Sequence, residues 1–451
     1  MAAFDDPLQD PLGFLGDLLT RVRKAGADAA DVMLGESQSL SIERRLGKPE
    51  GLERSESRDV TLRALVGRRQ AVVSATEFSE RSISSLVERA VAMARIAPED
   101  PHCGLADPAQ LDRVIADLET ADDDEPSAEA LDERAAAAED AARSVAGVTN
   151  SEGAQASWGR SRTYLVASNG FSGSVAHSRH SVSVSVLAGE GTAMERDDDY
   201  AIAIRAADLR DPTDIGRTAG QRAVRRLNPR KIATTRVPVV FEPRTAVSLL
   251  GHLASAINGA AVARGTSFLK DKRGEAIFAP TVTVIDDPLR KRGLRSRSFD
   301  GEGLPTRMRS LIDGGVLTGF LLDLASARQL KMEPTGSATR GGSGLPSPST
   351  SNLYLVAGTK TPEALMREVG TGLYVTDLIG MGVNIVTGDY SRGAAGFWIE
   401  NGELAYPVSE ITIAGTLLEM FAGLEAANDL TFRWGTDSPT VRLPAMTVAG
   451  R

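Results

Sequence analysis

Glycine is concentrated in one stretch of this chain, residues 380–402, which reads GMGVNIVTGDYSRGAAGFWIENG. Glycine loses more conformational freedom on folding than any other residue, so such a stretch is costly unless a particular backbone path requires it. We expect that path to be set by Gly382, Gly388, Gly393 and Gly396. The polar residues that lie among these glycines are the candidate functional group of the chain: Asn384, Asp389, Ser391 and Arg392.

A helix is predicted to follow Pro243, a residue that suits the first turn of a helix. The apolar residues that recur there at helical spacing are Ala246, Leu249, Leu250, Leu253, Ala254 and Ile257. A zinc peptidase helix needs two histidines on one face and a glutamate beside the first. Here His252 is followed by Leu253, and neither Ala256 nor Ile257 can provide a second ligand. We therefore predict that His252 is a packed or partly exposed side chain.

The remaining histidines and the single cysteine do not form a recognisable metal motif. His177 and His180 lie just before the alternating segment 181–186, which predicts a half-buried strand. Residues three apart on a strand face opposite sides, so these two cannot bind one ion. Cys103 follows His102 in a loop without further ligands nearby. We predict no metal site in this chain.

The overall composition is that of a globular cytoplasmic protein. The chain has 451 residues, 42% of them hydrophobic, which favours two or three domains. No apolar run approaches the ~18 residues of a membrane span, and the first residues lack a signal-peptide pattern. A net charge of −9 argues against a nucleic-acid surface. The basic clusters at 222–231 and 290–292 are interpreted as solvated faces or subunit contacts.

The pattern along the chain predicts an α+β fold in three parts. Residues 1–120 should form an N-terminal α+β domain in which helices lie beside an antiparallel sheet, because helical spacing at 15–22 and 83–94 flanks short alternating segments. Residues 121–232 should contain a central helix and an antiparallel hairpin, and residues 233–451 a strand-rich C-terminal domain. The acidic run 122–125 is interpreted as a solvated linker.

Three dipeptides predict hairpin turns. Asn169-Gly170 separates two strand-like segments, and Asn-Gly readily takes the positive φ of a type I′ turn. Asp313-Gly314 and Asn401-Gly402 give the same signal in the C-terminal part. Several serines lie in the first hairpin, but without a base they are more simply explained as the solvated face of the sheet.

The glycine-rich stretch resembles the C-terminal motif of the TldD/PmbA family. Other segments are also similar to that family: ASNGFSGS at 167–174, FDGEGLPT at 299–306 and LDLASAR at 322–328. The family has two subunit types, TldD with a His-Glu-x-x-x-His zinc helix and PmbA (TldE) without it. The TldD type also has a metal-binding Cys near its C-terminus, whereas residues 431–451 contain none. The resemblance is therefore to the PmbA type.

This resemblance implies a role in a cytosolic metalloprotease that cleaves unfolded or extended peptides. The chain would form a heterodimer with a TldD-type subunit that holds the zinc, or a homodimer when isolated, and would have no catalytic residue or cofactor of its own. Asn384, Asp389, Ser391 and Arg392 would lie at the substrate chamber. Exposed strand edges in the C-terminal part would pair with the extended peptide.

Two alternatives remain open at this point. The chain could be a free-standing peptide hydrolase that uses Asn384, Asp389 and Ser391, or a homodimeric peptide-binding module without catalysis. Polar residues in a glycine-rich turn usually serve turn geometry, which favours a structural role for them. A co-purifying chain with the His-Glu-x-x-x-His motif would distinguish the heterodimer from both alternatives.

Overall fold

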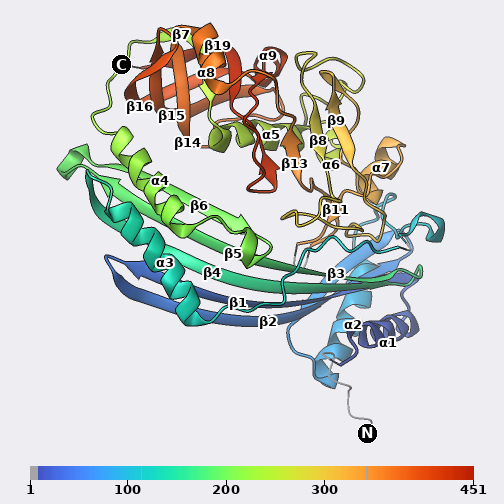
Figure 1. Cartoon of the computed structure of the whole chain (residues 1–451). Helices are drawn as coiled ribbons and strands as arrows, with labels where there is room; N and C mark the ends of the chain where they lie inside the picture. Colours follow the sequence, from blue (N-terminus) through green and yellow to red (C-terminus); the bar gives the residue numbers. More distant parts are fainter. Residues whose placement is uncertain (1–8, 113, 342–343, 451) are drawn as a thin grey trace.

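The computed structural model describes residues 9–112, 114–341 and 344–450. It shows a long curved sheet with helices on it, and a strand-rich C-terminal part to one side of that sheet (Figure 1). The predicted α+β fold, with N-terminal helices beside an antiparallel sheet and a strand-rich C-terminal domain, is confirmed. None of the helices in these residues is both long and apolar enough to cross a membrane.

The N-terminal sheet has six antiparallel strands in the order β3-β2-β1-β4-β5-β6. Their bounds are β1 (Ala29–Arg45), β2 (Lys48–Val66), β3 (Arg69–Ala75), β4 (Val148–Ala167), β5 (Ser172–Ala188) and β6 (Glu195–Ala203). Because β1 pairs with β4, segments 1–120 and 121–232 contribute to one continuous sheet. The division into domains at 120 and 232 stays a proposal.

Four helices pack on this sheet: α1 (Pro11–Lys24), α2 (Glu80–Ile96), α3 (Ala128–Arg143) and α4 (Pro212–Arg225). Alternate residues of β1 point toward them. Val32 and Leu34 belong to a core with α1 and α2, whereas Leu40 and Ile42 belong to a second core with α3 and α4. Each helix pair therefore covers one end of the long strands.

The predicted hairpins form, with differences in two of the turns. At Asp313-Gly314 the central residues are Gly314 and Gly315, with φ of 53° and 83°, because Asp313 pairs with Val316. β4 and β5 pair across Asn169-Gly170 as expected, but only Gly170 has a positive φ, of 95°. The type I′ turn predicted there is therefore wrong, because that turn needs positive φ at both central residues. Asn401 and Gly402, with φ of 53° and 81°, do meet this requirement between β15 and β16.

The C-terminal part contains a closed barrel. Its strands pair in the ring β16-β15-β14-β7-β19, closed by the contact of β16 with β19. The bounds are β7 (Thr235–Phe241), β14 (Gly372–Ile379), β15 (Asp389–Glu400), β16 (Glu403–Thr416) and β19 (Val441–Ala449), with β17 (Glu425–Ala426) beside β19. The closing contact covers Thr412–Ala414 of β16, whereas residues 403–411 of that strand have β15 on one side and, in the described chain, a single bridge from Arg230 to Val408 on the other. The expectation that exposed strand edges in the C-terminal part pair with an extended peptide stays a prediction.

Smaller elements complete the C-terminal part. A five-stranded sheet consists of β10 (Val316–Leu317), β9 (Arg309–Asp313), β8 (Val284–Asp286), β13 (Leu353–Leu355) and β18 (Thr436–Asp437). A two-stranded sheet pairs β11 (Ala338–Thr339) with β12 (Ser347–Pro348). The helices are α5 (Pro243–Ala256), α6 (Gly259–Ala263), α7 (Leu324–Leu330), α8 (Pro362–Val369) and α9 (Leu417–Ala422). Three short 3-10 turns lie at Pro108–Gln110, Gly191–Ala193 and Ala206–Asp208.

The N-terminal sheet has a long free edge along part of β2. β3 pairs with β2 only from Val60 to Val66. In the described chain, residues 48–59 of β2 therefore have a strand neighbour, β1, on one side only. Most of these residues are exposed, and several are charged.

Candidate functional site

Helix α5 carries His252 directly after barrel strand β7. Pro243 lies in its first turn. Of the residues whose spacing predicts the helix, Ala254 is partly buried and the others are buried: Ala246, Leu249, Leu250, Leu253 and, just beyond the helix, Ile257. His252 is half-buried and lies near β15, where its ring centroid is 6.0 Å from that of Tyr390. The helix therefore orients the single histidine toward the glycine-rich motif.

Strand β15 divides the predicted site residues between two faces. Asp389 and Ser391 are exposed, whereas Tyr390 between them is 1% exposed. Because alternate residues share a face, Arg392 lies on the side of Tyr390. Burial and the positive charge of Arg392 lower the pKa of His252 to about 4. The structure therefore brings Arg392 close to His252 and separates it from Asp389 and Ser391.

Asn384 and Asp389 close the turn that precedes β15. The Asn384 amide donates a hydrogen bond to the Asp389 carbonyl at 2.9 Å, and its side-chain oxygen accepts one from the amide of Val386 at 2.9 Å. The hydroxyl of Thr387 donates to Oδ2 of Asp389 at 2.6 Å. These bonds are those of a turn. In the described part of the chain no histidine is hydrogen-bonded to Ser391, so no nucleophile and base pair is formed there.

The glycines of the motif set the backbone path for two different reasons. Gly388 has a positive φ of 85°. A Cβ at Gly382 would lie 1.9 Å from the carbonyl oxygen of Ser391, and one at Gly396 would lie 1.9 Å from that of Tyr374. A Cβ at Gly393 would be 3.3 Å from Ile379, a tight but less severe contact. Glycine is therefore required in this motif mainly because neighbouring backbone lies too close for a Cβ, and at Gly388 because of the positive φ.

The other predicted residues lie apart from this motif. His177 and His180 belong to β5, where alternation places them on opposite faces. His180 is fully buried, and its Nε2 is 3.6 Å from Oδ2 of Asp122 in the acidic linker. Burial lowers the pKa of both histidines and raises the pKa of the Cys103 thiol. The structure therefore gathers none of these groups around His252.

The described chain has no cluster of side chains suited to a metal ion. Within residues 9–112, 114–341 and 344–450, no three His, Cys, Asp or Glu side chains lie together in a way that could hold one. His252 has a guanidinium as its charged neighbour instead of a carboxylate. A cation beside the imidazole opposes the binding of a second cation. The residues around α5 therefore do not fit a zinc ion.

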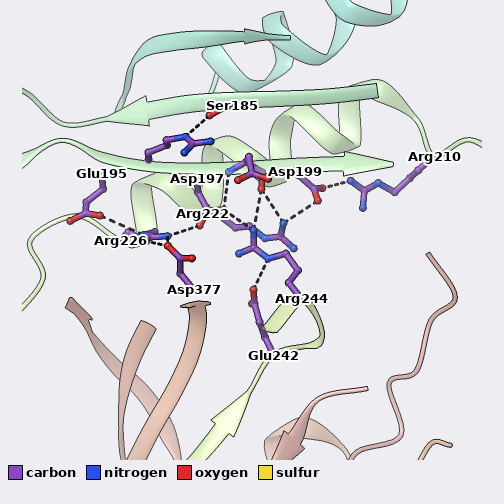
Figure 2. Close-up of polar contacts among 12 residues, drawn as sticks. Ser185, Glu195, Asp197, Asp199, Arg210, Arg222, Arg226, Glu242, Arg244 and Asp377 are labelled. Atoms are coloured by element: carbon purple, nitrogen blue, oxygen red, sulfur yellow. Dashed lines mark hydrogen bonds and ion pairs between the residues drawn. The ribbon is translucent and has the colours of Figure 1, made fainter. Parts of the chain in front are cut away.

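A buried network of acids and arginines fixes the start of α5 and was not predicted from the sequence. Figure 2 shows Arg244 between two acids: its Nη1 is 2.8 Å from Oδ1 of Asp197 on β6, and its Nε is 2.5 Å from Oε1 of Glu242. Arg226, which follows the last residue of α4, contacts the partly exposed Asp377 of β14 at 3.4 Å. Burial raises the pKa of Glu242 despite these partners. The network connects the N-terminal sheet to the barrel.

This network corrects one interpretation of the basic residues at 222–231. Arg222 and Arg226 were expected on a solvated face or a subunit contact. Arg222 instead lies 3.0 Å from Asp199, which is 3% exposed, and Arg226 is 3.5 Å from Asp197. The acids face these arginines because β6 lies under α4, a relationship that the spacing of charges along the chain does not indicate.

A second buried cluster connects β1 to the loops of the C-terminal part. The carboxylate of Asp31 lies against Arg63 of β2, with Nε to Oδ2 at 2.7 Å, and against Arg340, with Nη2 to Oδ2 at 2.9 Å. The two guanidinium groups outweigh burial and hold the pKa of Asp31 at about 2. Nearby, burial and the negative charge of Asp300 raise the pKa of Glu302 to about 8.

Comparison with known proteins identifies relatives over the full length of the described fold. Three family domains match: PmbA/TldA metallopeptidase domain 1 at residues 30–94, the central domain at 121–227 and the C-terminal domain at 234–450. Metalloprotease PmbA of Escherichia coli O157:H7 is 37% identical over 427 residues, covering 94% of this chain and 93% of the relative. The PmbA homolog of Haemophilus influenzae is 35% identical over 452 residues, covering 100% of this chain and 98% of the relative.

Solved structures share the same fold. A Bacteroides thetaiotaomicron protein, a candidate modulator of DNA gyrase, has a TM-score of 0.90 at 28% identity, covering 99% of this chain and 100% of its own. TldE from Thermococcus kodakarensis has a TM-score of 0.86 at 21% identity, covering 96% of this chain and 99% of its own. At that identity the likeness to TldE concerns the fold alone.

Proposed function

This chain belongs to the PmbA/TldD metallopeptidase family, and from that premise we propose that it is the PmbA-type (TldE-type), non-catalytic subunit of a cytoplasmic peptidase. Its partner in this proposal is a TldD-type subunit that holds the zinc ion. The pair cleaves unfolded peptides. The observation that carries the proposal is the neighbourhood of α5, where His252 faces Tyr390 and Arg392 instead of further ligands.

The residues of this chain support positioning and binding. The contacts of Arg244 with Asp197 and Glu242 hold the start of α5 against the N-terminal sheet. The turn that ends at Asp389 leaves the side chains of Asp389 and Ser391 exposed. In the proposed assembly these two side chains line the substrate chamber and bind the peptide, while Arg392 has a local structural role beside His252.

Reconstitution with a TldD-type subunit tests this function. The isolated chain should not hydrolyse an unfolded peptide, the mixture should, and a chelator should abolish the activity of the mixture. Asp389→Asn should lower the activity of the mixture without changing complex formation. Asp313→Asn, at the exposed turn between β9 and β10, is the matched control.

The free-standing hydrolase makes the opposite prediction. Cleavage by the isolated chain that persists in chelator and is lost on Ser391→Ala or Asp389→Ala would overturn the proposal and support that alternative. Failure of the two subunits to form a complex at micromolar concentration would overturn the heterodimer.

A peptide-binding module without a catalytic partner is a second candidate, favoured by the free edge of β2 at 48–59. An extended peptide can add to such an edge through backbone hydrogen bonds. The isolated chain, as a homodimer, should then bind an unfolded peptide but not the same peptide with N-methylated amides, which cannot donate to the edge. Equal binding of both peptides, or binding of neither, would contradict this candidate.

A further inference from the structure

A hollow of about 550 Å³ lies in the C-terminal part, and its described lining residues all lie outside the glycine-rich motif. Its walls come from β9, from the segments that follow β10 and α7, and from the loop between α6 and β8 that contains Arg273. The lining residues are Arg273, Arg309, Ser310, Leu311, Thr318, Gly319, Phe320, Lys331, Met332, Glu333 and Thr335. A volume of this order is typical of small-molecule sites.

Three cations line this hollow without a carboxylate partner. In the described chain, Arg273, Arg309 and Lys331 form no ion pair, although the protein has a net charge of −9 and many of its arginines are paired. The acid in the lining is Glu333, which is exposed. Three unpaired positive charges around one cavity produce a local field that attracts anions.

The two guanidinium groups are held so that their outer nitrogens remain available. Nε of Arg309 donates to the carbonyl of Thr335 at 3.1 Å, and Nε of Arg273 donates to that of Thr318 at 3.5 Å. In the described residues, their η nitrogens have no hydrogen-bond partner. A guanidinium anchored in this way presents a planar pair of donors that matches an oxyanion. Burial and the positive charge of Arg307 lower the pKa of Arg309, and a bound anion would counteract both effects.

Lys331 has an unusual backbone conformation. Lys331 follows α7 with φ 54° and ψ 45°, the left-handed conformation in which helix ends usually have Gly or Asn. A side chain with a Cβ is disfavoured there, and such strain is often retained where a side chain has a function. The strained position places the lysine at the rim of the hollow.

We propose that this hollow binds a small ligand through an oxyanion, a phosphate or a carboxylate, held by Arg273, Arg309 and Lys331. The floor includes Leu311, which is 3% exposed, and Phe320, which is 6% exposed. An apolar part of the ligand packs on them. The lining of the hollow shares no residue with α5 or β15, so binding there can be measured separately from the proposed peptidase role.

Titration calorimetry on the full-length chain tests the site with three probes at constant ionic strength. These are inorganic phosphate, a blocked dipeptide with a free C-terminal carboxylate, and the amide of the same dipeptide. Binding of phosphate or of the acid, but not of the amide, is expected and identifies the source of the oxyanion. Binding of none of the three would overturn the proposal.

Variants separate binding from folding. Arg273→Gln and Arg309→Gln should each weaken binding roughly tenfold, the scale of one lost charge-assisted hydrogen bond. Lys331→Gly should weaken binding while raising the melting temperature, because glycine relieves the left-handed strain. Lys270→Gln, at an exposed lysine outside the hollow, should bind like the wild type. If Lys331→Gly and Arg273→Gln, tested as single variants, both bind as tightly as the wild type, the hollow is not the site.

Discussion

The ring of Tyr390 stands edge-on to the imidazole of His252, with the two planes at 76°. The Tyr390 hydroxyl and the His252 Nε2 are both buried and have no hydrogen-bond partner in the described residues. Burial raises the pKa of Tyr390, so its hydroxyl stays neutral at physiological pH. The position where a zinc peptidase helix has its metal is therefore surrounded in this chain by an aromatic ring and a cation.

We predict that the purified chain does not retain stoichiometric zinc, because His252 has no second ligand and has Arg392 as a neighbour. The chain should be equilibrated with zinc, dialysed and analysed for metal. A content near one zinc per chain that disappears in His252→Ala would contradict this prediction.

The charge of Arg392 should be visible in the titration of His252. In the wild type the pKa of His252 is about 4, from burial and from Arg392. Arg392→Gln removes the positive charge, so the pKa should move upward toward 6.5, while Lys270→Gln leaves it unchanged. The imidazole resonance followed by NMR against pH measures both. An unchanged titration in Arg392→Gln would mean that burial alone sets this pKa.

Stability should fall as the pH rises through the titration of Glu302. Its folded-state pKa of about 8 exceeds the ordinary value of 4.5, so the folded chain binds more protons than the unfolded chain between these values. The contribution is complete below about pH 4.5 and is lost by about pH 8, with a size on the order of a few kcal/mol. The free energy of unfolding, measured with urea at several pH values in this range, should fall less steeply with pH in Glu302→Gln than in the wild type. The exposed Glu50→Gln is the control, and an equal slope in both variants would count against this role of Glu302.

Arg244→Ala should destabilise the fold strongly. It leaves the buried Asp197 without one partner and Glu242 without its 2.5 Å contact, which costs about 3–5 kcal/mol for a buried ion pair. Arg217→Ala removes an exposed pair with Asp214 on α4 and should cost less than about 1 kcal/mol. Denaturant unfolding of both variants provides the comparison, and similar costs would show that the Arg244 network contributes no more than a surface pair.

The glycines of the motif should differ in their tolerance of alanine. Gly396→Ala should be the more damaging, because its Cβ would lie 1.9 Å from the carbonyl oxygen of Tyr374. Gly388→Ala adds a left-handed strain of about 1–2 kcal/mol. Gly251→Ala, in α5 with open space around its Cβ, should be neutral or stabilising by up to about 1 kcal/mol. Thermal melting ranks the three.

The same glycine variants also test the proposed substrate chamber. In the reconstituted pair, Gly388→Ala and Asp389→Asn should reduce peptidase activity more than they reduce stability. Wild-type activity in both would place the motif outside the chamber.

Local features of the site could be predicted because their causes are local. The apolar repeat at 246–257 is enough to indicate α5, and the missing ligands beside His252 are visible in the sequence. The hairpin at Asn401-Gly402 follows from the turn preference of two residues. At Asn169-Gly170 the sequence predicts the hairpin but not the type of turn. A loop with a positive φ at Gly170 alone connects the same two strands.

The sequence by itself determined the α+β class, helix α5 and its single histidine, because periodicity and residue type act over a few residues. The closed barrel, the separation of Arg392 from Asp389 and Ser391, and the buried ion pairs were decided only by the tertiary structure. Arg340 meets Asp31 across 309 residues of chain, and Arg244 meets Asp197 across 47. Such partners leave no local signal. The residues around an arginine or aspartate do not indicate whether folding will bring it to a counterion or leave it in water.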